Sequence, residues 1–190
     1  MGNNKTFLIA SDDRYLLSVL NAPLMWWHNW RYLPHMKDEA LSPVGFKMES
    51  LPIATPTDEI RAEVEAVATG LIDITKARQE AGGMLLDWLR MEYDLEKPGK
   101  KLQNPFDLDS DAFVNEVKKR RGRSRTLTAA GLRALRDEYT STIEPMRRKL
   151  NEAAGIEGRL SDLVNAAYGL TEEEVELMWR TAPPRMPIVR

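Results

Sequence analysis

The sequence contains no cysteine, and only two of its 190 residues are histidines. Without cysteine, a disulfide framework and a thiolate zinc site are both excluded, and a reducing compartment is favoured. We therefore expect a cytoplasmic protein. His28 and His35 lie seven residues apart with no cysteine beside them, so we predict no metal centre.

Long apolar runs are also absent. No stretch approaches the roughly 18 apolar residues of a membrane-spanning helix, so we expect no membrane partner. The opening residues, MGNNKTFLIA, lack the basic segment and long apolar core of a signal peptide. The formal net charge is only −2, so any attraction to nucleic acid has to be local.

Catalytic motifs are scarce. The sequence has no glycine-rich phosphate loop and no G-x-S-x-G motif. Residues 116–118 spell E-x-K, a triplet that metal-dependent nucleases carry on a strand, where alternate side chains share a face. Phe113 and Val117 instead have helical spacing, on which Glu116 and Lys118 diverge. We therefore predict no catalytic residue and no enzymatic activity for this chain by itself.

Two segments carry apolar residues at alternating intervals of about three and four. Such spacing is typical of amphipathic helices that pack along a seam. We predict a long antiparallel helical hairpin, resembling a coiled coil, with a break near Pro145. The first series is Ile60, Val64, Val67, Leu71 and Ile74, and the second is Leu132, Leu135, Tyr139, Ile143, Met146 and Leu150.

Several helix ends are marked by local signals. Thr55 is suited to be the N-cap of the first long helix, with Pro56 at its first position. Gly169 is suited to the left-handed position after a helix. Thr171 and Glu174 have the spacing of a capping box, which predicts a short C-terminal helix.

The first 54 residues differ from the rest in their pattern of predicted secondary structure. TFLIA resembles a short strand, two short helices are separated by Pro23, and three prolines favour an extended segment over residues 43–56. The predicted fold is therefore mainly α, a long helical hairpin with a small α+β region at its N-terminus. The expected boundaries are 1–54 for that region, 55–93 for the first long helix, 94–125 for a loop and basic connector, and 126–190 for the second long helix, a short C-terminal helix and an extended tail.

A basic run, VNEVKKRRGRSR, begins at Val114. Clusters of this kind are either solvated connectors or contacts to nucleic-acid phosphates, and we favour phosphate contact, which would position the protein without reading bases. Trp26 and Trp30 share a helix face and are expected in the core, whereas Trp27 points elsewhere. The candidate DNA-binding residues are Lys118, Lys119, Arg120, Arg121, Arg123, Arg125 and Trp27.

Two stretches near the N-terminus resemble the end of the target-recognition domain of bacterial restriction-modification proteins, in the group of adenine-specific DNA methyltransferases. The two stretches are FLIASDDRYLLSVLNAPLMWWHNW and GFKMESLPIATP. In that family a helix ending in Leu-Asn-Ser precedes an aromatic stretch, and an extended segment closes on Leu-Pro-Ile-Pro. Residues 20–22, Leu-Asn-Ala, and 51–53, Leu-Pro-Ile, stand in those places. Two later stretches are similar to the extreme C-terminus of large single-chain type II restriction-methylation proteins. They are DWLRMEYDLEKPGKKL and LVNAAYGLTEEEVELMWRTAPPRMP.

The resemblance implies the end of a target-recognition domain plus a helical spacer, with double-stranded DNA and a methyltransferase or restriction catalytic domain or subunit as partners. The family's catalytic half binds S-adenosylmethionine and carries an Asn-Pro-Pro-Tyr motif. Residues 104–107, Asn-Pro-Phe-Asp, lack its second proline and its tyrosine. We therefore expect no cofactor here, because S-adenosylmethionine would bind to a missing catalytic domain. A helical protein–protein interaction module without DNA contact is the alternative.

Overall fold

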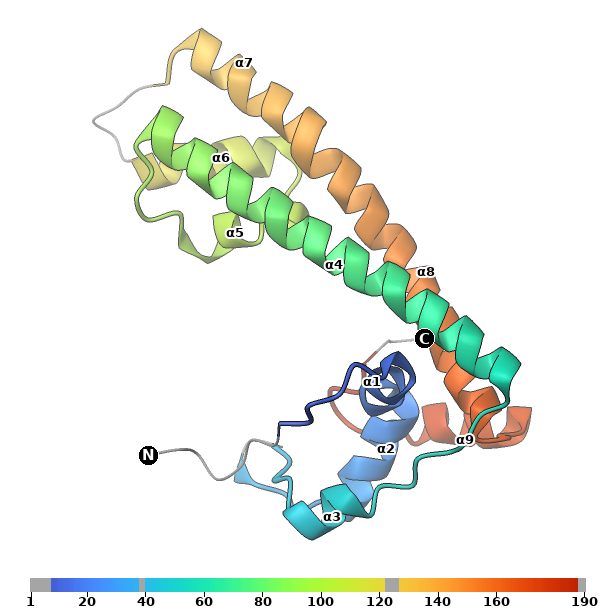
Figure 1. Ribbon diagram of the computed structural model, residues 1–190. Coiled ribbons are helices and arrows are strands. Elements are labelled where there is room, and N and C mark those ends of the chain that lie inside the picture. Colours follow the sequence, from blue (N-terminus) through green and yellow to red (C-terminus); the bar gives the residue numbers. More distant parts are fainter. Residues whose placement is uncertain (1–7, 38–39, 122–126, 188–190) are drawn as a thin grey trace. The chain divides into compact units, whose positions relative to one another are not determined.

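The computed structural model describes residues 8–37, 40–121 and 127–187, and within these ranges the chain is mainly α-helical (Figure 1). This confirms the predicted mainly α class. The chain divides into two units, a first unit of residues 1–71 and 154–190 and a second unit of residues 72–153. None of the helices in the described ranges has the length and hydrophobicity that crossing a bilayer requires.

The N-terminal part of the first unit is helical rather than α+β. Helix α1 (Arg14–Asn21) begins where the Asp13 side chain accepts a hydrogen bond from the Leu16 amide at 2.9 Å. Helix α2 (Pro23–Tyr32) follows, with the proline at its start. The described residues of the predicted strand TFLIA, 8–10, are not in a strand, and no other strand occurs in the described ranges. The α+β prediction is therefore not borne out there.

A short helix, α3 (Gly45–Glu49), interrupts the segment that was predicted to be extended. That prediction was wrong at these residues because the flanking prolines lie outside the five-residue helix. Residues 51–57 belong to no helix or strand. Two tyrosine hydroxyls hold this stretch by donating to backbone carbonyls, Tyr15 to Ala54 at 2.9 Å and Tyr168 to Pro52 at 2.6 Å.

Helix α4 (Asp58–Tyr93) begins two residues later than the sequence suggested. The Thr57 hydroxyl, not that of Thr55, accepts from the backbone of its first turn, at Ile60. The C-terminal half of α8 (Glu144–Ala167) and α9 (Glu172–Arg180) complete the first unit. Its buried core is formed by Tyr15, Val19, Ala22, Met25, Val64 and Val164.

The second unit gathers helices around a larger core. It contains the rest of α4, then α5 (Gly99–Gln103), the 3-10 turn η2 (Pro105–Asp107), α6 (Ser110–Arg121), α7 (Ala129–Glu138), the π-helical turn η3 (Tyr139–Ile143) and the start of α8. The segment expected as a loop and connector, 94–125, thus includes three helical elements. Its core residues include Leu95, Leu102, Phe106, Leu108, Phe113, Val114 and Val117.

The break predicted near Pro145 takes the form of η3. A proline lacks the amide hydrogen of a helical bond, and its ring clashes with the carbonyl four residues earlier. The π-helical turn before Pro145 widens the helix at that point, and α8 then continues. Tyr139 at the start of η3 is buried, and its hydroxyl donates to the Leu108 carbonyl at 3.2 Å.

Candidate nucleic-acid interface

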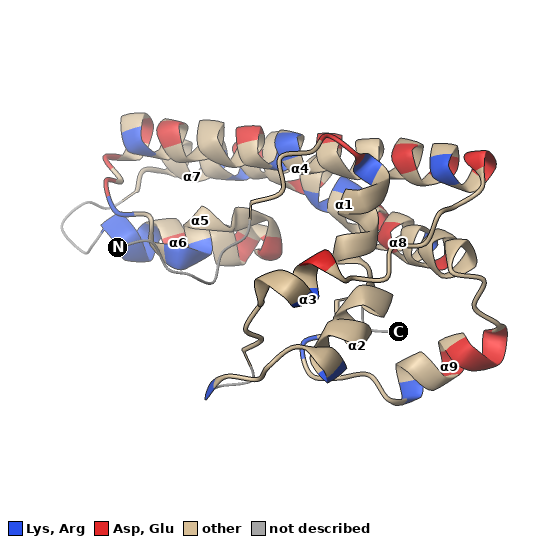
Figure 2. Cartoon of the chain, turned by 60° about the horizontal axis from the view of Figure 1, so that its bottom comes forward, with Lys and Arg blue, Asp and Glu red and all other residues tan. Residues whose placement is uncertain are grey.

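Helix α6 presents one face to the core of the second unit and carries a basic C-terminal turn. The Asp109 side chain accepts from the Ala112 amide at 2.8 Å and caps its start. Phe113 and Val117, one helical turn apart, are fully buried. Lys118 and Lys119 are exposed in the last turn, where cations suit the helix dipole. Figure 2 shows α6 with its Lys and Arg residues in blue.

Arg120 is held by an ion pair on the same helix. Its Nε lies 2.8 Å from Oε1 of Glu116, whose side chain is 7% exposed, against 37% for Arg120. The hydrogen bond from Arg120 lowers the pKa of Glu116, burial opposes this shift, and the charges of Lys119, Arg120 and Lys101 add to it. Lys101 of α5 therefore lies close to the basic turn of α6.

Gly99 allows α5 to approach Arg120. Its φ of +73° lies in the left-handed region, and a Cβ built there would be 2.4 Å from Arg120 Cζ. Only glycine adopts this φ without strain and, lacking a Cβ, leaves the Arg120 guanidinium in place. This close approach places the exposed Lys100 and Lys101 next to the end of α6.

Arg121 has a structural role at the end of α4. Its Nε donates to the carbonyl of Tyr93, the last residue of α4, at 3.1 Å. The guanidinium carbon also lies 5.5 Å from the centre of the Tyr93 ring. Arg121 thus satisfies a carbonyl at the negative end of a helix dipole and is half-buried.

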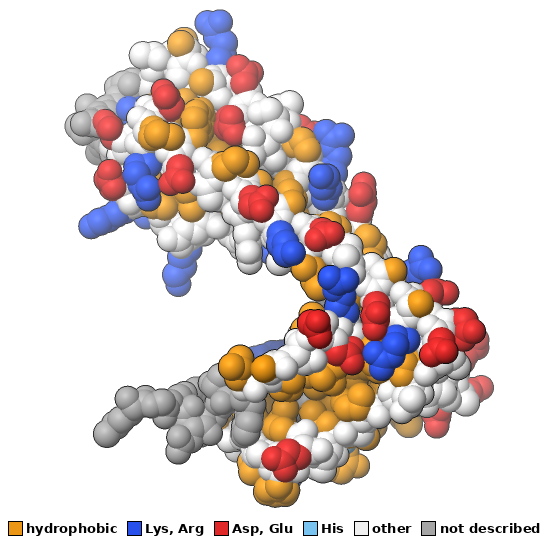
Figure 3. Space-filling model, viewed as in Figure 1, with side chains coloured by type: hydrophobic (Ala, Val, Ile, Leu, Met, Phe, Trp, Pro, Cys, Tyr) orange, Lys and Arg blue, Asp and Glu red, His pale blue; other side chains and the backbone are white. Residues whose placement is uncertain are grey.

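The cations that remain form what we call the basic surface. It includes Lys100 and Lys101 of α5, which are not among the candidate residues proposed from the sequence, although the sequence contains the basic stretch KPGKK. Lys and Arg side chains project over α5 and α6 in Figure 3. Two further candidates, Arg123 and Arg125, lie outside the described residues. The basic surface consists of Lys100, Lys101, Lys118, Lys119 and Arg120, all exposed.

Trp27 is committed to contacts within the first unit. Its Nε1 donates to the Thr181 hydroxyl at 2.9 Å, and the Arg31 guanidinium carbon lies 3.7 Å from the ring centre. One ring face and the only indole donor are therefore occupied. Trp26 and Trp30 are half-buried rather than in the core, with ring centres 6.4 Å apart.

The structure brings no metal-binding group together among the described residues. The E-x-K triplet lies on helix α6, where Glu116 is buried and Lys118 is exposed. The two side chains diverge as predicted, so they do not form the strand-borne pair of a nuclease site.

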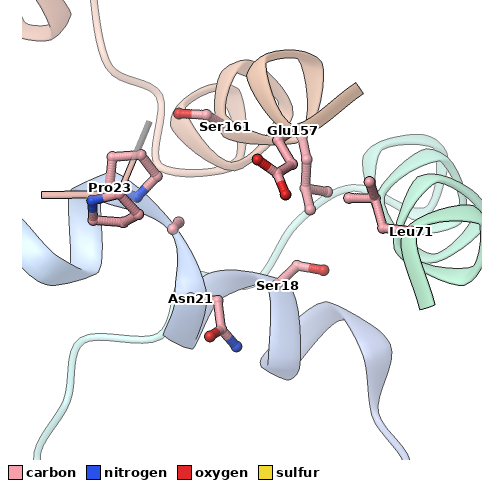
Figure 4. Close-up of a pocket in the computed structure, with 9 residues that line it drawn as sticks. Ser18, Asn21, Pro23, Leu71, Glu157 and Ser161 are labelled. Atoms are coloured by element: carbon pink, nitrogen blue, oxygen red, sulfur yellow. The ribbon is translucent and has the colours of Figure 1, made fainter. Parts of the chain in front are cut away.

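A cavity of about 290 Å³ occurs in the first unit, between α1 and α8 (Figure 4). Ser18, Asn21, Glu157 and Ser161 supply its polar lining. Ser18 and Asn21 already donate to backbone carbonyls of α1. The volume is at the lower end of the range for ligand pockets, about 300–1,000 Å³, which leaves room only for a small polar molecule.

Residues 57–164 match a family described as a domain of unknown function, DUF8810, and the chain belongs to that family. The match runs from the start of α4 almost to the end of α8, so it includes the basic surface and excludes Trp27 and α9. No curated protein and no solved structure matches the chain.

Proposed function

We propose that this member of the DUF8810 family is a DNA-contacting helical spacer of a restriction-modification DNA methyltransferase. In this proposal the second unit holds the DNA backbone, and the chain docks to a separate catalytic part that binds S-adenosylmethionine. The observation that carries the proposal is the basic surface, because it places five exposed cations on two neighbouring helices.

Electrostatics support a backbone contact. In the part of the chain that the structure describes, the carboxylate that interacts with these cations is that of Glu116, and it is bound to Arg120. Within the described residues, Lys118 and Lys119 form no ion pair, so their charges are available to phosphates. Phosphates are the same at every site, so the contact would give affinity without sequence preference.

Rigidity supports the spacer part of the proposal. In the second unit the Tyr93 hydroxyl, at the end of α4, donates to the carbonyl of Gly131, near the start of α7. In the first unit Glu63, near the start of α4, pairs with Arg159 of α8 at 3.2 Å. Within each unit, the contact has the order of an antiparallel helical hairpin.

The test is DNA binding across a range of salt concentrations. Replacing Lys100, Lys101, Lys118 and Lys119 with alanine should weaken binding to any duplex by a similar factor. Each lost phosphate contact should flatten the plot of log affinity against log salt by about 0.9. The double variant Lys76→Ala/Lys149→Ala serves as a control, because both lysines are exposed and lie in the same unit.

If the control variant loses as much DNA affinity per lysine removed as the fourfold variant does, the DNA contact is not localised to the basic surface. Absence of DNA binding by the unaltered chain would overturn the DNA part of the proposal. We also expect no methyl transfer from S-adenosylmethionine to DNA by this chain alone. Labelled DNA in that assay would overturn the assignment of methyl transfer to a separate part.

The alternative is a protein-interaction module without DNA contact, and one feature of α4 favours it. Met84 and Met91 are 66% and 73% exposed and lie seven residues apart, so they share one side of the helix. Exposed methionines are common on adaptable binding surfaces. A chain that binds no DNA, but loses a protein partner when both methionines become lysine, would support this reading.

A further inference from the structure

The last two helices of the first unit enclose a second, larger hollow. It has a volume of about 570 Å³ and lies between the end of α8 and helix α9. We call it the α8–α9 groove. Its apolar lining comes from Ala166, Leu170, Val175 and Trp179, and its acidic lining from Asp162, Glu172 and Glu176.

Asn165 lines the same groove and has an unmet bonding requirement. The residue is 4% exposed, and its Oδ1 has no hydrogen-bond partner in the described part of the chain. A buried polar atom without a partner typically destabilises a protein by about 1–3 kcal/mol. Because this oxygen itself is inaccessible to solvent, it lies beneath the surface of the groove, and the apolar and acidic side chains form the accessible lining.

The fold fixes the groove before any ligand binds. Gly169 ends α8 with a φ of +65°, and the Thr171–Glu174 capping box sets the start of α9. Met178, 2% exposed, anchors α9 in the first unit. The first turn of α9 carries three consecutive glutamates, which are coloured red in Figure 2. The groove therefore needs little rearrangement to bind a partner.

From these features we infer that the α8–α9 groove docks a basic amphipathic helix of a partner protein. Apolar side chains of that helix fill the lining formed by Leu170 and Val175, and its lysines or arginines meet Glu172 and Glu176. Helices that lay an apolar face into a groove are a common mode of recognition. The carboxylates repel phosphates, so the occupant is not nucleic acid, and the inference does not depend on DNA binding by the second unit.

The test uses the full chain and a fluorescein-labelled synthetic helix. The probe is about 14 residues long, four helical turns, with leucines along one face and lysines and arginines beside them. A second probe keeps the leucines and has glutamate in place of every cation. We expect the basic probe to bind and the acidic probe to bind at least about tenfold more weakly, because charge complementarity suppresses the wrong partner.

Matched variants place the contact. Glu176→Lys, in the middle of α9, should weaken the basic probe about tenfold. Glu152→Lys changes the net charge equally at an exposed residue of the second unit and should leave binding within about twofold. Equal effects of the two variants, equal binding of the two probes, or no binding of the basic probe would each overturn the inference.

Asn165→Leu gives an independent readout. The change removes the unsatisfied oxygen and keeps a similar volume, so it should raise the melting temperature and leave binding of the basic probe within about twofold, since that oxygen lies beneath the groove. A folded Asn165→Leu variant that loses probe binding would contradict docking through the apolar lining and the glutamates.

Discussion

Substitution of Arg121 should separate the contribution of the basic run to folding stability from its contribution to DNA binding. The basic run that contains it reads as a single phosphate-binding segment, yet its Nε bonds the last residue of α4, Tyr93, at 3.1 Å. We therefore expect Arg121→Ala to lower stability and to leave DNA affinity nearly unchanged. Lys118→Ala/Lys119→Ala should do the opposite, because both lysines are exposed.

The size of the effect follows from the contacts. A hydrogen bond from a charged donor contributes about 1.5–3 kcal/mol, and partial exposure of Arg121 places its value at the lower end. The helix dipole adds about 0.3–1 kcal/mol, and the loss of both interactions is partly offset by water that solvates the freed carbonyl. We estimate a loss of about 1–2 kcal/mol, or roughly 5–15 °C in melting temperature for a unit of this size.

Urea denaturation followed by circular dichroism measures the stability change, and fluorescence anisotropy of labelled duplex measures binding. Arg121→Lys is the matched control. It keeps the charge and loses the planar donor, so about half of the stability loss should remain. The reasoning is refuted if Arg121→Ala leaves the denaturation midpoint unchanged and weakens DNA binding as much as the loss of Lys118 or Lys119.

The remaining predictions concern the fold. Leu89→Ala, at a fully buried residue of α4, should cost about 2–5 kcal/mol, and an unchanged urea midpoint would contradict its place in the core. Gly99→Ala should cost about 1–2 kcal/mol through its left-handed φ, with a further cost for moving the Arg120 guanidinium away from the new Cβ, and only this further cost should vanish in an Arg120→Ala background. The pKa values of Asp13 and Glu116 are lowered in the folded chain, the first mainly by the Leu16 amide and the second mainly by Arg120. The unfolded chain therefore binds more protons in acid, so their stabilisation should be complete above about pH 5 and decline as the pH falls further; a melting temperature that rises on acidification from pH 5 to 3 would contradict this sign.

Features set by a few neighbouring residues were predictable from the sequence. The capping box at Thr171 and the left-handed Gly169 depend on short-range geometry, and both occur as expected. The distortion before Pro145 depends on the chemistry of one proline. The start of α4 was less certain because Thr55 and Thr57 both offer a capping hydroxyl, and the structure uses Thr57.

Features set by tertiary packing were not predictable in the same way. Leu95, Leu102 and Phe106 lie in a segment rich in turn residues, DLEKPGKKLQNPFDLDSDA, so the segment resembled a loop, yet all three lie in the core of the second unit. Their burial depends on partners far away in sequence. The role of Arg121 had a usable signal, because it follows Val117 by four residues and must share the buried face of the helix.

The acidic groove and the basic surface have opposite charges, so a second copy of this chain has to be considered as the occupant of the groove. The side chains of the basic surface argue against it. The nearest apolar residue on α6, Val117, is fully buried in the core, and Lys118 and Lys119 follow it directly. A second copy would therefore bring charge to the rim and leave the apolar lining at Leu170 and Val175 in water. A partner helix that carries leucines beside its cations satisfies the lining and the rim together.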